Sequence, residues 1–390
     1  MRILTLNCGS SSIKFRVFDD EEELISGLID AISLENSKIE FSFNGKNEVL
    51  KRRIVDHSKG IKEMLQILDD TIRLKTIDAV AHRVVHGGEE FRETTLINEV
   101  ILTKLKALVP LAPLHNPKNI LGIEEMSKVL KGIPQVAVFD TAFHSTIPKY
   151  AHMYAIPYEY YQKYKIRRYG FHGTSHKFVS CEAMRHFSQL KKIISCHLGN
   201  GASITAIKNG KSVDTSMGFT PLEGLIMGTR SGDLDPAIIT FLMEKEKLSV
   251  KEMNKILNKK SGLLGLSQLS SDMRILLSQK EQNEKAALAI KAFLYRVVKY
   301  IGAYAAALNG IDAIIFTGGM GENNPYLRFE ILRQLTYLGV VTDNNANKKN
   351  ESVISARDSK VKVLVIKTNE ELQAAREAKE LLLKQSEASI

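Results

Sequence analysis

The chain has 390 residues, of which 44% are hydrophobic and 25% are charged. A single hydrophobic core rarely grows this large, so the length predicts two domains. No apolar run approaches the roughly 18 residues that suggest a membrane span, and the first residues, MRILTLNCGS, lack the long apolar core of a signal peptide. We therefore expect a cytoplasmic protein with no membrane partner. The three cysteines, Cys8, Cys181 and Cys196, are scattered, which argues against a disulfide framework or a zinc knuckle.

The formal net charge of +10 admits three interpretations. A basic balance is typical of nucleic-acid-binding proteins, it attracts small polyanions such as nucleotides, and it also arises from a lysine-rich surface with no partner. Segments such as KEMNKILNKK and NANKKNE mix Asn and Glu among the lysines, as solvated faces and loops do. We favour the third interpretation for most of the lysines and expect no nucleic-acid partner.

Apolar periodicity predicts strands and helices that alternate along the chain. The expected strands are 2–6, 13–18, 38–43, 79–85, 135–139, 192–197, 203–208, 313–317 and 362–366. The expected helices are 59–71, 119–131, 175–188, 237–246, 284–308 and 370–384. Strands that alternate with helices indicate an α/β protein.

Two segments suggest an internal duplication. LTLNCGSSSIKFRVFD begins at residue 4 and IISCHLGNGASITAIKN at residue 193, and each reads as a strand, a polar glycine-containing turn and a second strand. We infer two similar α/β halves, each beginning with a hairpin, that face one another across a cleft. Because β-hairpins are common, the repeat alone does not establish this. The Pro-containing segment 145–161 is the best candidate for the boundary.

The turn of the first hairpin has the chemistry of a phosphate site. Gly9 lets backbone N–H groups approach an anion, Ser10–Ser12 add hydroxyl donors, Lys14 adds positive charge, and Asn7 offers an amide oxygen to a metal or its waters. It is not a Walker loop, because no G-x-x-x-x-G-K-[ST] runs into a helix. The alternative is a plain polar turn with an exposed lysine.

Two more glycine-rich turns follow strands, HLGNGAS at 197–203 and TGGMGENN at 317–324. The carboxyl ends of strands are where α/β folds bind nucleotides, and three such turns are much stronger evidence than one. Two halves with a hairpin loop from each resemble the superfamily of sugar kinases, actin and heat-shock ATPases. The three turns resemble its two phosphate loops and its adenosine loop.

Basic and acidic side chains follow several other strands. Arg83 lies at the end of one strand, and an arginine fork suits bidentate recognition of a carboxylate or phosphate. Asp140 follows another apolar strand, and Arg230 lies in a loop of small residues. His172 and His176 are four residues apart, a spacing that also occurs in zinc sites. The intervening Gly-Thr-Ser and the absence of a His-Glu-x-x-His disfavour zinc, and both arginines could instead form structural salt bridges.

Several long and uncommon sequence motifs along the chain together indicate a resemblance to a known family. They are HRVVHGG at 82–88, PLAPLHNP at 110–117, FDTAFH at 139–144, RYGFHGTSH at 168–176, HLGNG at 197–201, GFTPLEGLIMGTRSGDLDP at 218–236, GGMGEN at 318–323 and TNEE at 368–371. With N-x-G-S-S-S-x-K at 7–14, they make the whole chain resemble the acetate kinase (acetokinase) family. The resemblance implies two duplicated ribonuclease H-like (actin-like ATPase) domains with an interdomain cleft, and a homodimer.

The implied reaction is reversible transfer of a phosphoryl group from ATP, the co-substrate, to acetate, giving acetyl phosphate and ADP, with Mg²⁺ or alternatively Mn²⁺. A carboxylate with a pKa of roughly 4 to 5 is already ionised at neutral pH and needs no base. The difficulty is to bring two anions together in line and to hold the charge of the transferring group. Cations and fixed donors meet that need.

The resemblance also implies the roles of individual residues. Arg83 would hold the acetate carboxylate, and His172 and Arg230 would stabilise the transferring group. Asp140 would be the catalytic carboxylate. We expect Asp140 to organise Mg²⁺, water or a cation rather than to act as a base. Mg²⁺ would be held by Asn7 and Glu370, mostly through waters. The pocket for the methyl group of acetate would be lined by Val85, Leu114, Phe171 and Pro221. ATP would be bound by Ser10, Ser12, Lys14, His197, Leu198, Gly199, Asn200, Gly201, Asp272, Met273, Arg274, Gly319, Met320, Gly321, Glu322 and Asn323.

The expected domains are 1–145 with the C-terminal helix 372–390, and 146–371, which would bind the nucleotide. The long helix at 286–308 is either an interface or a core element. One alternative function is that of a propionate or butyrate kinase of the same fold. A sugar kinase is disfavoured by Arg83 and Arg230, which suit an anionic acceptor better than a neutral hydroxyl group. A nucleic-acid-binding or sensor protein is supported only by the net charge. Val85 favours acetate, because a smaller residue there would enlarge the slot.

Overall fold

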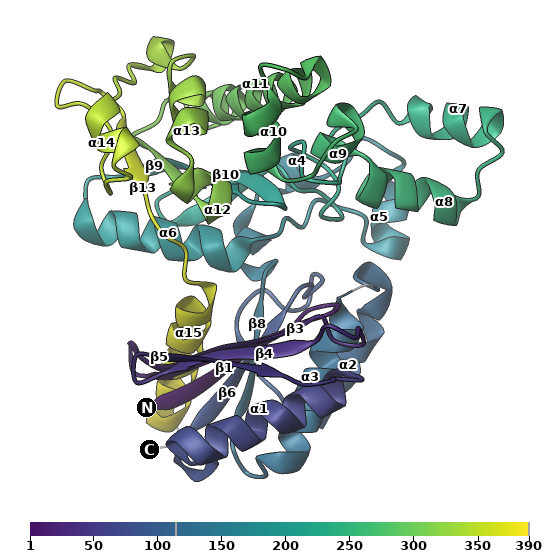
Figure 1. Cartoon of the computed structure of the whole chain (residues 1–390), viewed down its shortest axis with the longest axis vertical. Helices are drawn as coiled ribbons and strands as arrows, with labels where there is room; N and C mark the ends of the chain where they lie inside the picture. The colour runs from purple at the N-terminus through teal and green to yellow at the C-terminus, as the bar shows by residue number, and fades with distance from the viewer. Residues whose placement is uncertain (114, 389–390) are drawn as a thin grey trace. The chain divides into compact units, whose positions relative to one another are not determined.

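The structure is a computed structural model that describes residues 1–113 and 115–388, and the chain divides into two compact units (Figure 1). Unit 1 contains residues 1–143 and 369–390, and unit 2 contains residues 144–368. The sequence places the corresponding boundaries at 145/146 and 371/372. None of the described helices is long and apolar enough to cross a bilayer.

Unit 1 is built on an eight-stranded sheet in the order β5-β4-β3-β2-β1-β6-β8-β7. Its strands are β1 (Arg2–Cys8), β2 (Ile13–Asp19), β3 (Glu22–Asp30), β4 (Lys38–Phe43), β5 (Lys46–Lys51), β6 (Ala79–Val84), β7 (Thr95–Leu96) and β8 (Gln135–Phe139). Its helices are α1 (His57–Ile72), α2 (Glu99–Ala107), α3 (Asn116–Val129) and α15 (Glu370–Ala388).

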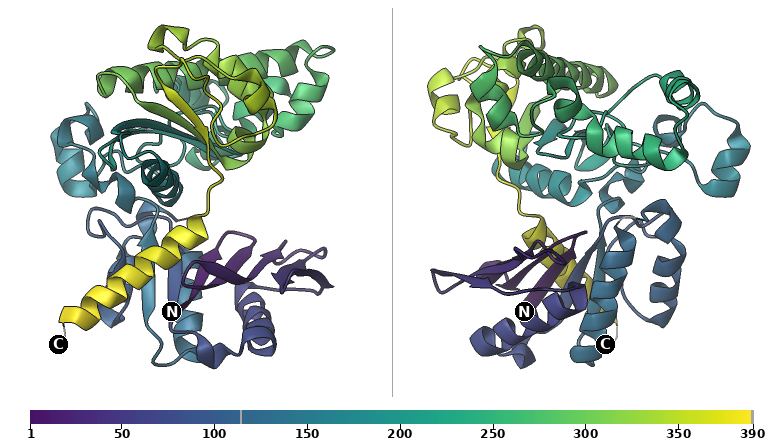
Figure 2. Two further views of the ribbon diagram at one scale, coloured as in Figure 1. Left: turned by 90° about the vertical axis from the view of Figure 1, so that its left-hand side faces the viewer. Right: turned by 45° about the vertical axis from the view of Figure 1, so that its right-hand side comes forward.

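Helices pack on both faces of this sheet, because successive side chains of a strand point to opposite faces and apolar residues occur on both. Ile13, Phe15 and Val17 of β2 are buried in the core that includes Met64 of α1 and Met126 of α3. The opposite face is covered by α15, whose small residues pack against β1, β6 and β8; this core is Ile3, Phe18, Ala79, Ala81, Val136, Val138, Ala374, Ala375 and Ala378. The left view of Figure 2 shows the C-terminal helix, in yellow, in front of the strands of this sheet.

Unit 2 is built on a five-stranded sheet in the order β11-β10-β9-β12-β13. Its strands are β9 (Lys192–Leu198), β10 (Ala202–Lys208), β11 (Lys211–Thr215), β12 (Ala313–Thr317) and β13 (Lys362–Val365). Its helices are α4 (Lys149–His152), α5 (Tyr158–Tyr164), α6 (Gly173–His186), α7 (Ala237–Lys245), α8 (Val250–Lys255), α9 (Gly262–Ser267), α10 (Met273–Gln279), α11 (Glu284–Ala307), α12 (Gly318–Asn323), α13 (Pro325–Leu332) and α14 (Asn344–Lys348).

The two sheets share one topology, which confirms the duplication. In each, an antiparallel hairpin is followed by two parallel strands: β1 pairs with β2 and then β6 and β8 follow, as β9 pairs with β10 and then β12 and β13 follow. The hairpins are also in the same register near their turns. Asn7 pairs with Lys14 in the first hairpin, and His197 pairs with Ser203 in the second.

The structure adds strands that the apolar pattern does not reveal. All residues of β5 are exposed or half-buried, so this edge strand carries no periodicity and forms by pairing with β4. The segment Gly318–Asn323, expected as a turn, is the short helix α12 that follows β12. The Glu322 side chain accepts a hydrogen bond from the Gly318 N–H at 2.8 Å, which supports the start of this helix.

Candidate active site

In unit 1 the turn of the first hairpin is held by its own backbone and by a histidine. The Gly9 N–H donates to the Ser12 carbonyl at 2.8 Å, and the His57 ring bonds the Gly9 carbonyl at 2.8 Å. Ser10 is exposed and Ser12 half-buried. Lys14 lies in β2, where its Nζ atom is 2.7 Å from Glu371 Oε1 at the start of α15. Sequence reasoning missed this buried partner of Lys14, although Glu371 belongs to the TNEE word.

Arg83, at the end of β6, and Asp140, just after β8, form a two-point ion pair. Arg83 Nε donates to Asp140 Oδ1 at 3.2 Å, and Arg83 Nη2 donates to Asp140 Oδ2. Arg83 Nη1 donates to Asn7 Oδ1 at 3.2 Å. Asp140 is 1% exposed, so the pair is desolvated on the carboxylate side. Burial opposes the charge of Arg83, but Asp140 and Glu370 hold its pKa above the ordinary value.

A guanidinium has five N–H donors, and the three bonds of Arg83 leave one N–H on each Nη atom for a further acceptor. Those two donors suit the two oxygens of a carboxylate. Asp140 accepts from the opposite edge and sets the orientation of the guanidinium. The arrangement fits a cation that binds a small carboxylate while a buried carboxylate holds it in place.

Oxygen donors gather beside this pair in unit 1. Glu370 at the start of α15 interacts electrostatically with Arg83, Asp140 and Glu371, and burial, reinforced by the two carboxylates, raises the pKa of Glu370 to about 7. A divalent cation would favour the ionised form of such a carboxyl group. Amide and carboxylate oxygens are the donors that Mg²⁺ prefers, and it keeps several waters. The amide oxygen of Asn7 and the carboxylate of Glu370 are donors of this kind, and no group of three or more His, Cys, Asp or Glu ligands occurs among the described residues.

In unit 2 His172 and Arg230 both lie close to Gly201. A Cβ atom placed on Gly201 would be 3.5 Å from His172 Nε2 and 3.7 Å from Arg230 Nη1. The side-chain position that glycine leaves empty is therefore in contact with both an imidazole and a guanidinium. His172 is in the left-handed region, with φ of 55°, just before α6, and its ring stacks on that of His197 with centroids 4.3 Å apart. A group that enters beside Gly201 meets both donors.

Arg230 has no carboxylate partner within the part of the chain that the structure describes. Its Nη1 donates to the Pro221 carbonyl at 3.0 Å and contacts the Met227 sulfur at 3.5 Å. Burial without a compensating anion lowers the pKa of Arg230 from its ordinary value. A half-buried guanidinium with only neutral acceptors is suited to bind an anion that arrives from outside.

Hydroxyl groups hold the histidines of unit 2. Ser203 Oγ lies 2.9 Å from His172 Nδ1 and 2.8 Å from His176 Nε2, and His176 Nδ1 bonds Ser195 Oγ at 2.8 Å. Both nitrogens of His176 thus have hydroxyl partners, and burial lowers its pKa well below the ordinary value. His176 is therefore a neutral structural group rather than a zinc ligand. Sequence reasoning missed Ser203, which occupies the position in the second hairpin that Lys14 has in the first.

A pocket of about 600 Å³ lies in unit 2 beside these turns. It is lined by Gly199, Asn200, Ser271, Asp272, Met273, Arg274, Gly319, Met320, Asn323 and Asn324. Three segments that are far apart in sequence thus meet at one pocket: the turn after β9, the start of α10 and helix α12. Eight of the ten lining residues were expected to bind ATP, and Ser271 and Asn324 are additions.

The other residues expected to bind ATP do not line this pocket. His197, Leu198 and Gly201 belong to the adjoining strand and turn, and Ser10, Ser12 and Lys14 belong to unit 1. The Gly321 carbonyl accepts a hydrogen bond from Arg328 at 2.8 Å, and Glu322 Oε1 accepts from Gly318, Thr317 and Thr368. Gly321 and Glu322 therefore shape helix α12, next to the pocket.

The residues expected around the methyl group of acetate are divided between the units. Val85 is buried in unit 1, and its N–H donates to Asn119 Oδ1 at 3.1 Å. Phe171 is buried and Pro221 half-buried in unit 2. Leu114 lies outside the described residues.

Comparison with known proteins matches this chain over its whole length. The profile of the acetokinase family matches residues 2–376. An acetate kinase from Thermotoga maritima is 53% identical over 98% of this chain and 99% of its own, and one from Caldicellulosiruptor saccharolyticus is 53% identical over 98% and 100%.

Solved structures agree with the sequence comparison. The crystal structure of Porphyromonas gingivalis acetate kinase is 43% identical, covers 98% of this chain and 99% of its own, and gives a TM-score of 0.92. A propionate kinase from Francisella tularensis is 44% identical, covers 96% and 98%, and also gives 0.92. The fold is accordingly the duplicated ribonuclease H-like (actin-like ATPase) fold that the sequence predicts. The chain belongs to the acetokinase family.

Proposed function

We propose that the chain is an acetate kinase, which transfers the γ-phosphoryl group of ATP reversibly and directly to acetate to give acetyl phosphate and ADP. The observation that carries the proposal is the half-buried guanidinium of Arg230, which has no carboxylate partner among the described residues and lies with His172 close to Gly201. The barrier of the reaction is electrostatic, because two anions must meet in line.

Arg83 binds the acetate carboxylate in this proposal. The carboxylate is ionised at neutral pH and attacks without a general base. The two N–H groups that Arg83 has beyond its bonds to Asp140 and Asn7 can hold both carboxylate oxygens or leave one of them for attack. Val85, Leu114, Phe171 and Pro221 form the proposed slot for the methyl group.

His172 and Arg230 stabilise the transferring phosphoryl group. Both present N–H donors beside Gly201, and charge that develops on the equatorial oxygens is held by donors already in place. The Ser203 hydroxyl at His172 Nδ1 fixes the orientation of the ring, so its Nε2 faces the Gly201 gap. The stacked ring of His197 limits the movement of His172 further.

Asp140 acts as an organiser of charge rather than as a base. Both of its oxygens are engaged by Arg83, and the nucleophile carries no proton to remove. An Asp140→Asn variant keeps the size of the side chain and loses the charge that orients Arg83. We expect reduced turnover and an altered Mg²⁺ dependence. Normal turnover with a normal Mg²⁺ dependence would contradict this role.

Asn7 and Glu370 would hold Mg²⁺, largely through waters, with Mn²⁺ as a substitute. When bound, the ion would neutralise charge on the nucleotide phosphates. The pocket in unit 2, which Gly199, Asn200 and Asp272–Arg274 help to line, would take ATP. Lys14, Ser10 and Ser12 would add donors from the first hairpin. The remaining proposed contacts to ATP are those of His197, Leu198, Gly201, and Gly319, Met320, Gly321, Glu322 and Asn323 of α12.

An assay for acyl phosphate tests the function directly. Purified chain, ATP, Mg²⁺ and acetate are incubated, and acetyl phosphate is trapped with hydroxylamine. We expect acetyl hydroxamate that depends on acetate and disappears on chelation of Mg²⁺. Turnover with a sugar hydroxyl in place of acetate, or no acyl phosphate from a folded protein that binds ATP, would overturn the proposal.

Propionate phosphorylation is the second candidate, because a propionate kinase has a TM-score of 0.92 with this structure. The two acids differ by one methylene, worth about 0.8 kcal/mol of burial. Values of kcat/KM for acetate, propionate and butyrate decide between them. A clear preference for propionate would overturn the assignment of acetate.

We also propose that the chain forms a homodimer through α7. This helix is strongly apolar, yet none of its residues is buried, and Ile238 and Phe241 are 45% and 58% exposed. Large apolar side chains exposed together on one helix mark a surface that contacts another molecule, and we take a second copy of this chain as that molecule. A Phe241→Glu variant should run as a monomer in light scattering. Leu288→Glu, on the exposed side of α11, is the matched control, and dissociation by this variant alone would place the interface on α11 instead.

A cytoplasmic location belongs to the same proposal, because ATP is the phosphoryl donor. Fractionation of cells that produce the chain tests it. Activity that sediments with membranes would contradict it.

A further inference from the structure

We propose that Tyr154, Arg168 and Glu223 position Arg230 and His172 relative to one another. These three side chains are named the Arg168 clamp. They lie in unit 2, and none of them was singled out by the sequence. The inference rests on the proposed function, because it takes Arg230 and His172 as the groups that stabilise the phosphoryl group. It assigns to the clamp a positioning role in that reaction.

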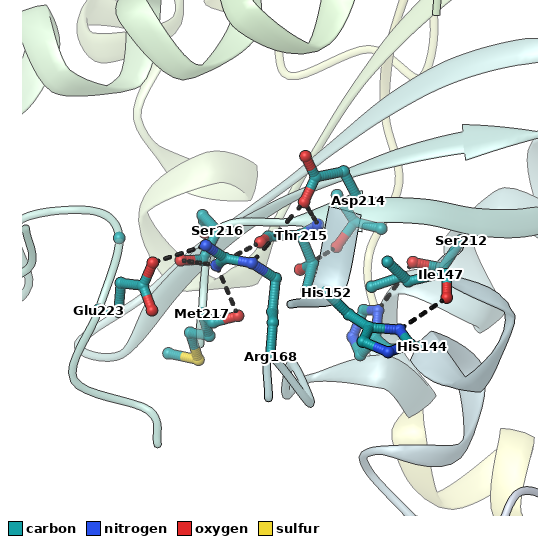
Figure 3. A network of polar contacts seen from close by, with 12 residues as sticks. His144, Ile147, His152, Arg168, Ser212, Asp214, Thr215, Ser216, Met217 and Glu223 are labelled. Atoms are coloured by element: carbon teal, nitrogen blue, oxygen red, sulfur yellow. Dashed lines mark hydrogen bonds and ion pairs between the residues drawn. The ribbon is translucent and has the colours of Figure 1, made fainter. Parts of the chain in front are cut away.

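Arg168 ties together the backbone at the end of β11. Its Nη1 lies 2.9 Å from the Thr215 carbonyl and 3.2 Å from the carbonyls of Ser216 and Met217 (Figure 3). Its Nη2 donates to Glu223 Oε1 at 2.6 Å. One guanidinium thereby connects the last residues of a sheet strand to a carboxylate further along the following loop. Figure 3 shows Arg168 between these carbonyl groups and Glu223.

Tyr154 holds the other oxygen of Glu223. The phenol donates to Glu223 Oε2 and accepts from the Phe219 N–H, the latter at 2.9 Å. Burial, followed by repulsion from Glu223, raises the pKa of Tyr154, so the phenol stays protonated and remains a donor. A Cβ atom on Gly218 would be 1.7 Å from Glu223 Oε2, which shows how closely the carboxylate lies on this turn. The position of Glu223 is therefore fixed by two donors and by the backbone beneath it.

The Arg168 clamp is connected to Arg230 by the short segment between Pro221 and Glu223. The Pro221 carbonyl, which accepts from Arg230 Nη1 at 3.0 Å, lies two residues before Glu223. The loop that carries Arg230 is closed at its base, where the Gly224 N–H donates to Asp233 Oδ1 at 2.7 Å and the Asp233 N–H donates to the Gly224 carbonyl at 3.0 Å. Displacement of Glu223 would move the acceptor that aims the guanidinium.

The Arg168 clamp is also connected to His172, through the segment that runs from Arg168 to His172. Arg168 lies four residues before His172, and the N–H groups of Tyr169 and Gly170 both donate to the Gly218 carbonyl, at 3.0 and 3.2 Å. The segment that leads to His172 is therefore bonded to the turn on which Glu223 lies. One ion pair joins the two segments that carry the two proposed phosphoryl-stabilising groups.

The desolvation penalty of the Arg168–Glu223 ion pair favours a positioning role over a purely stabilising one. The side chains of Arg168 and Glu223 are only 17% and 31% exposed, and partly desolvated charges stabilise a fold no better than well-packed apolar residues do. Glu223 is bonded through both oxygens, by Arg168 Nη2 at Oε1 and by the Tyr154 phenol at Oε2, and charge-assisted hydrogen bonds at both oxygens impose a direction that apolar packing does not. Errors of about 1 Å in the position of a catalytic group can cost about 100-fold in rate.

The test is a double-mutant cycle on kcat between Glu223→Gln and Arg230→Ala. If Glu223 acts through Arg230, Glu223→Gln lowers kcat by about 10- to 100-fold in the parent enzyme. In the Arg230→Ala background it then lowers kcat by a clearly smaller factor, because one of the two groups that it positions is gone and only the effect through His172 remains. We expect the KM for ATP to change much less than kcat in Glu223→Gln. Tyr154→Phe, which removes one donor to the same carboxylate, should show the same pattern with a smaller loss.

The control variant is Glu330→Gln, which breaks the Arg333–Glu330 ion pair of 2.7 Å on another surface of unit 2. It should leave kcat unchanged, and unfolding midpoints are recorded for every variant. Equal losses from Glu223→Gln in both backgrounds, or a loss that only follows a lowered midpoint, would overturn the inference and leave the proposed function standing. Full activity of Arg230→Ala would overturn both.

Discussion

The two arginines of the candidate site have opposite surroundings. Arg83 in unit 1 is paired with the buried carboxylate of Asp140 and bonded to Asn7, whereas Arg230 in unit 2 bonds a carbonyl and contacts a thioether. The pKa of Arg83 is held above its ordinary value, and that of Arg230 is lowered. A carboxylate neutralises the charge of Arg83, whereas Arg230 has no carboxylate partner among residues 1–113 and 115–388.

The difference indicates how one chain divides the handling of two anions. A guanidinium already paired with a carboxylate offers directional donors with little net charge, which suits a substrate that must bind and still react. A guanidinium without a counter-charge is suited to negative charge that grows during the reaction. The comparison predicts that loss of Arg83 is felt in stability and loss of Arg230 in rate.

The largest effect is expected for Arg83→Ala. Removing Arg83 takes its counter-charge away from the buried carboxylate of Asp140, so the free energy of unfolding should fall by about 3–5 kcal/mol. Chemical denaturation measures it. The double variant Arg83→Ala/Asp140→Ala is the control and should recover part of the loss. A single variant as stable as the parent would contradict the comparison.

Arg230→Ala should reduce kcat by about 100- to 1,000-fold, the range for loss of a preorganised donor to transition-state charge. The decrease in the free energy of unfolding should be no larger for Arg230→Ala than for Arg83→Ala, because no buried carboxylate loses its partner when Arg230 is removed. Steady-state kinetics and denaturation on the same protein check both statements. A variant that is unstable but fully active per folded molecule would reverse the roles given to the two arginines.

Acidification should weaken unit 1 through His82. Its ring bonds Gln135 at 2.7 Å, and burial lowers the pKa of His82 to about 4. In the unfolded chain its pKa is about 6.5, so between pH 6.5 and 4 the unfolded state binds the proton and the folded state does not. Stability is complete above pH 6.5 and falls by up to about 3 kcal/mol as the pH approaches 4.

Urea denaturation at several pH values measures this dependence. His86, whose pKa burial also lowers to about 4, adds to it with the same sign. His82→Gln should flatten the part of the slope that His82 causes. An unchanged slope in that variant would assign the acid sensitivity to other groups.

The smallest effect is expected for Val85→Ala. Removing two methyl groups from the proposed slot should raise kcat/KM for propionate relative to acetate by about 4-fold, the equivalent of about 0.8 kcal/mol for one buried methylene. Competition between the two acids measures the ratio. No change in the ratio would exclude Val85 from the slot and leave the roles of Arg83 and Arg230 untouched.

The sequence by itself determined the class of fold, the duplication and the family. Strands such as β6 and β8 contain short apolar runs, Ala79–Ala81 and Val136–Phe139, and Arg83 and Asp140 lie at or just after their ends. Glycine-rich words mark the turns after β1, β9 and β12. These signals are local, because a strand buried on both faces needs an apolar run and a turn against an anion needs small residues. The edge strand β5 carries no such signal, and its pairing with β4 had to come from the structure.

Only the tertiary structure decided which charges are paired. Lys14 and Glu371 are distant in sequence, and so are Arg168 and Glu223, yet both pairs are in contact. Sequence spacing cannot tell a neutralised arginine from an unpaired one, because that distinction depends on which carboxylate the fold brings within about 4 Å. The same reason explains why the Arg168 clamp and Ser203 went unnoticed: their roles lie in their partners, and the partners come from other segments of the chain.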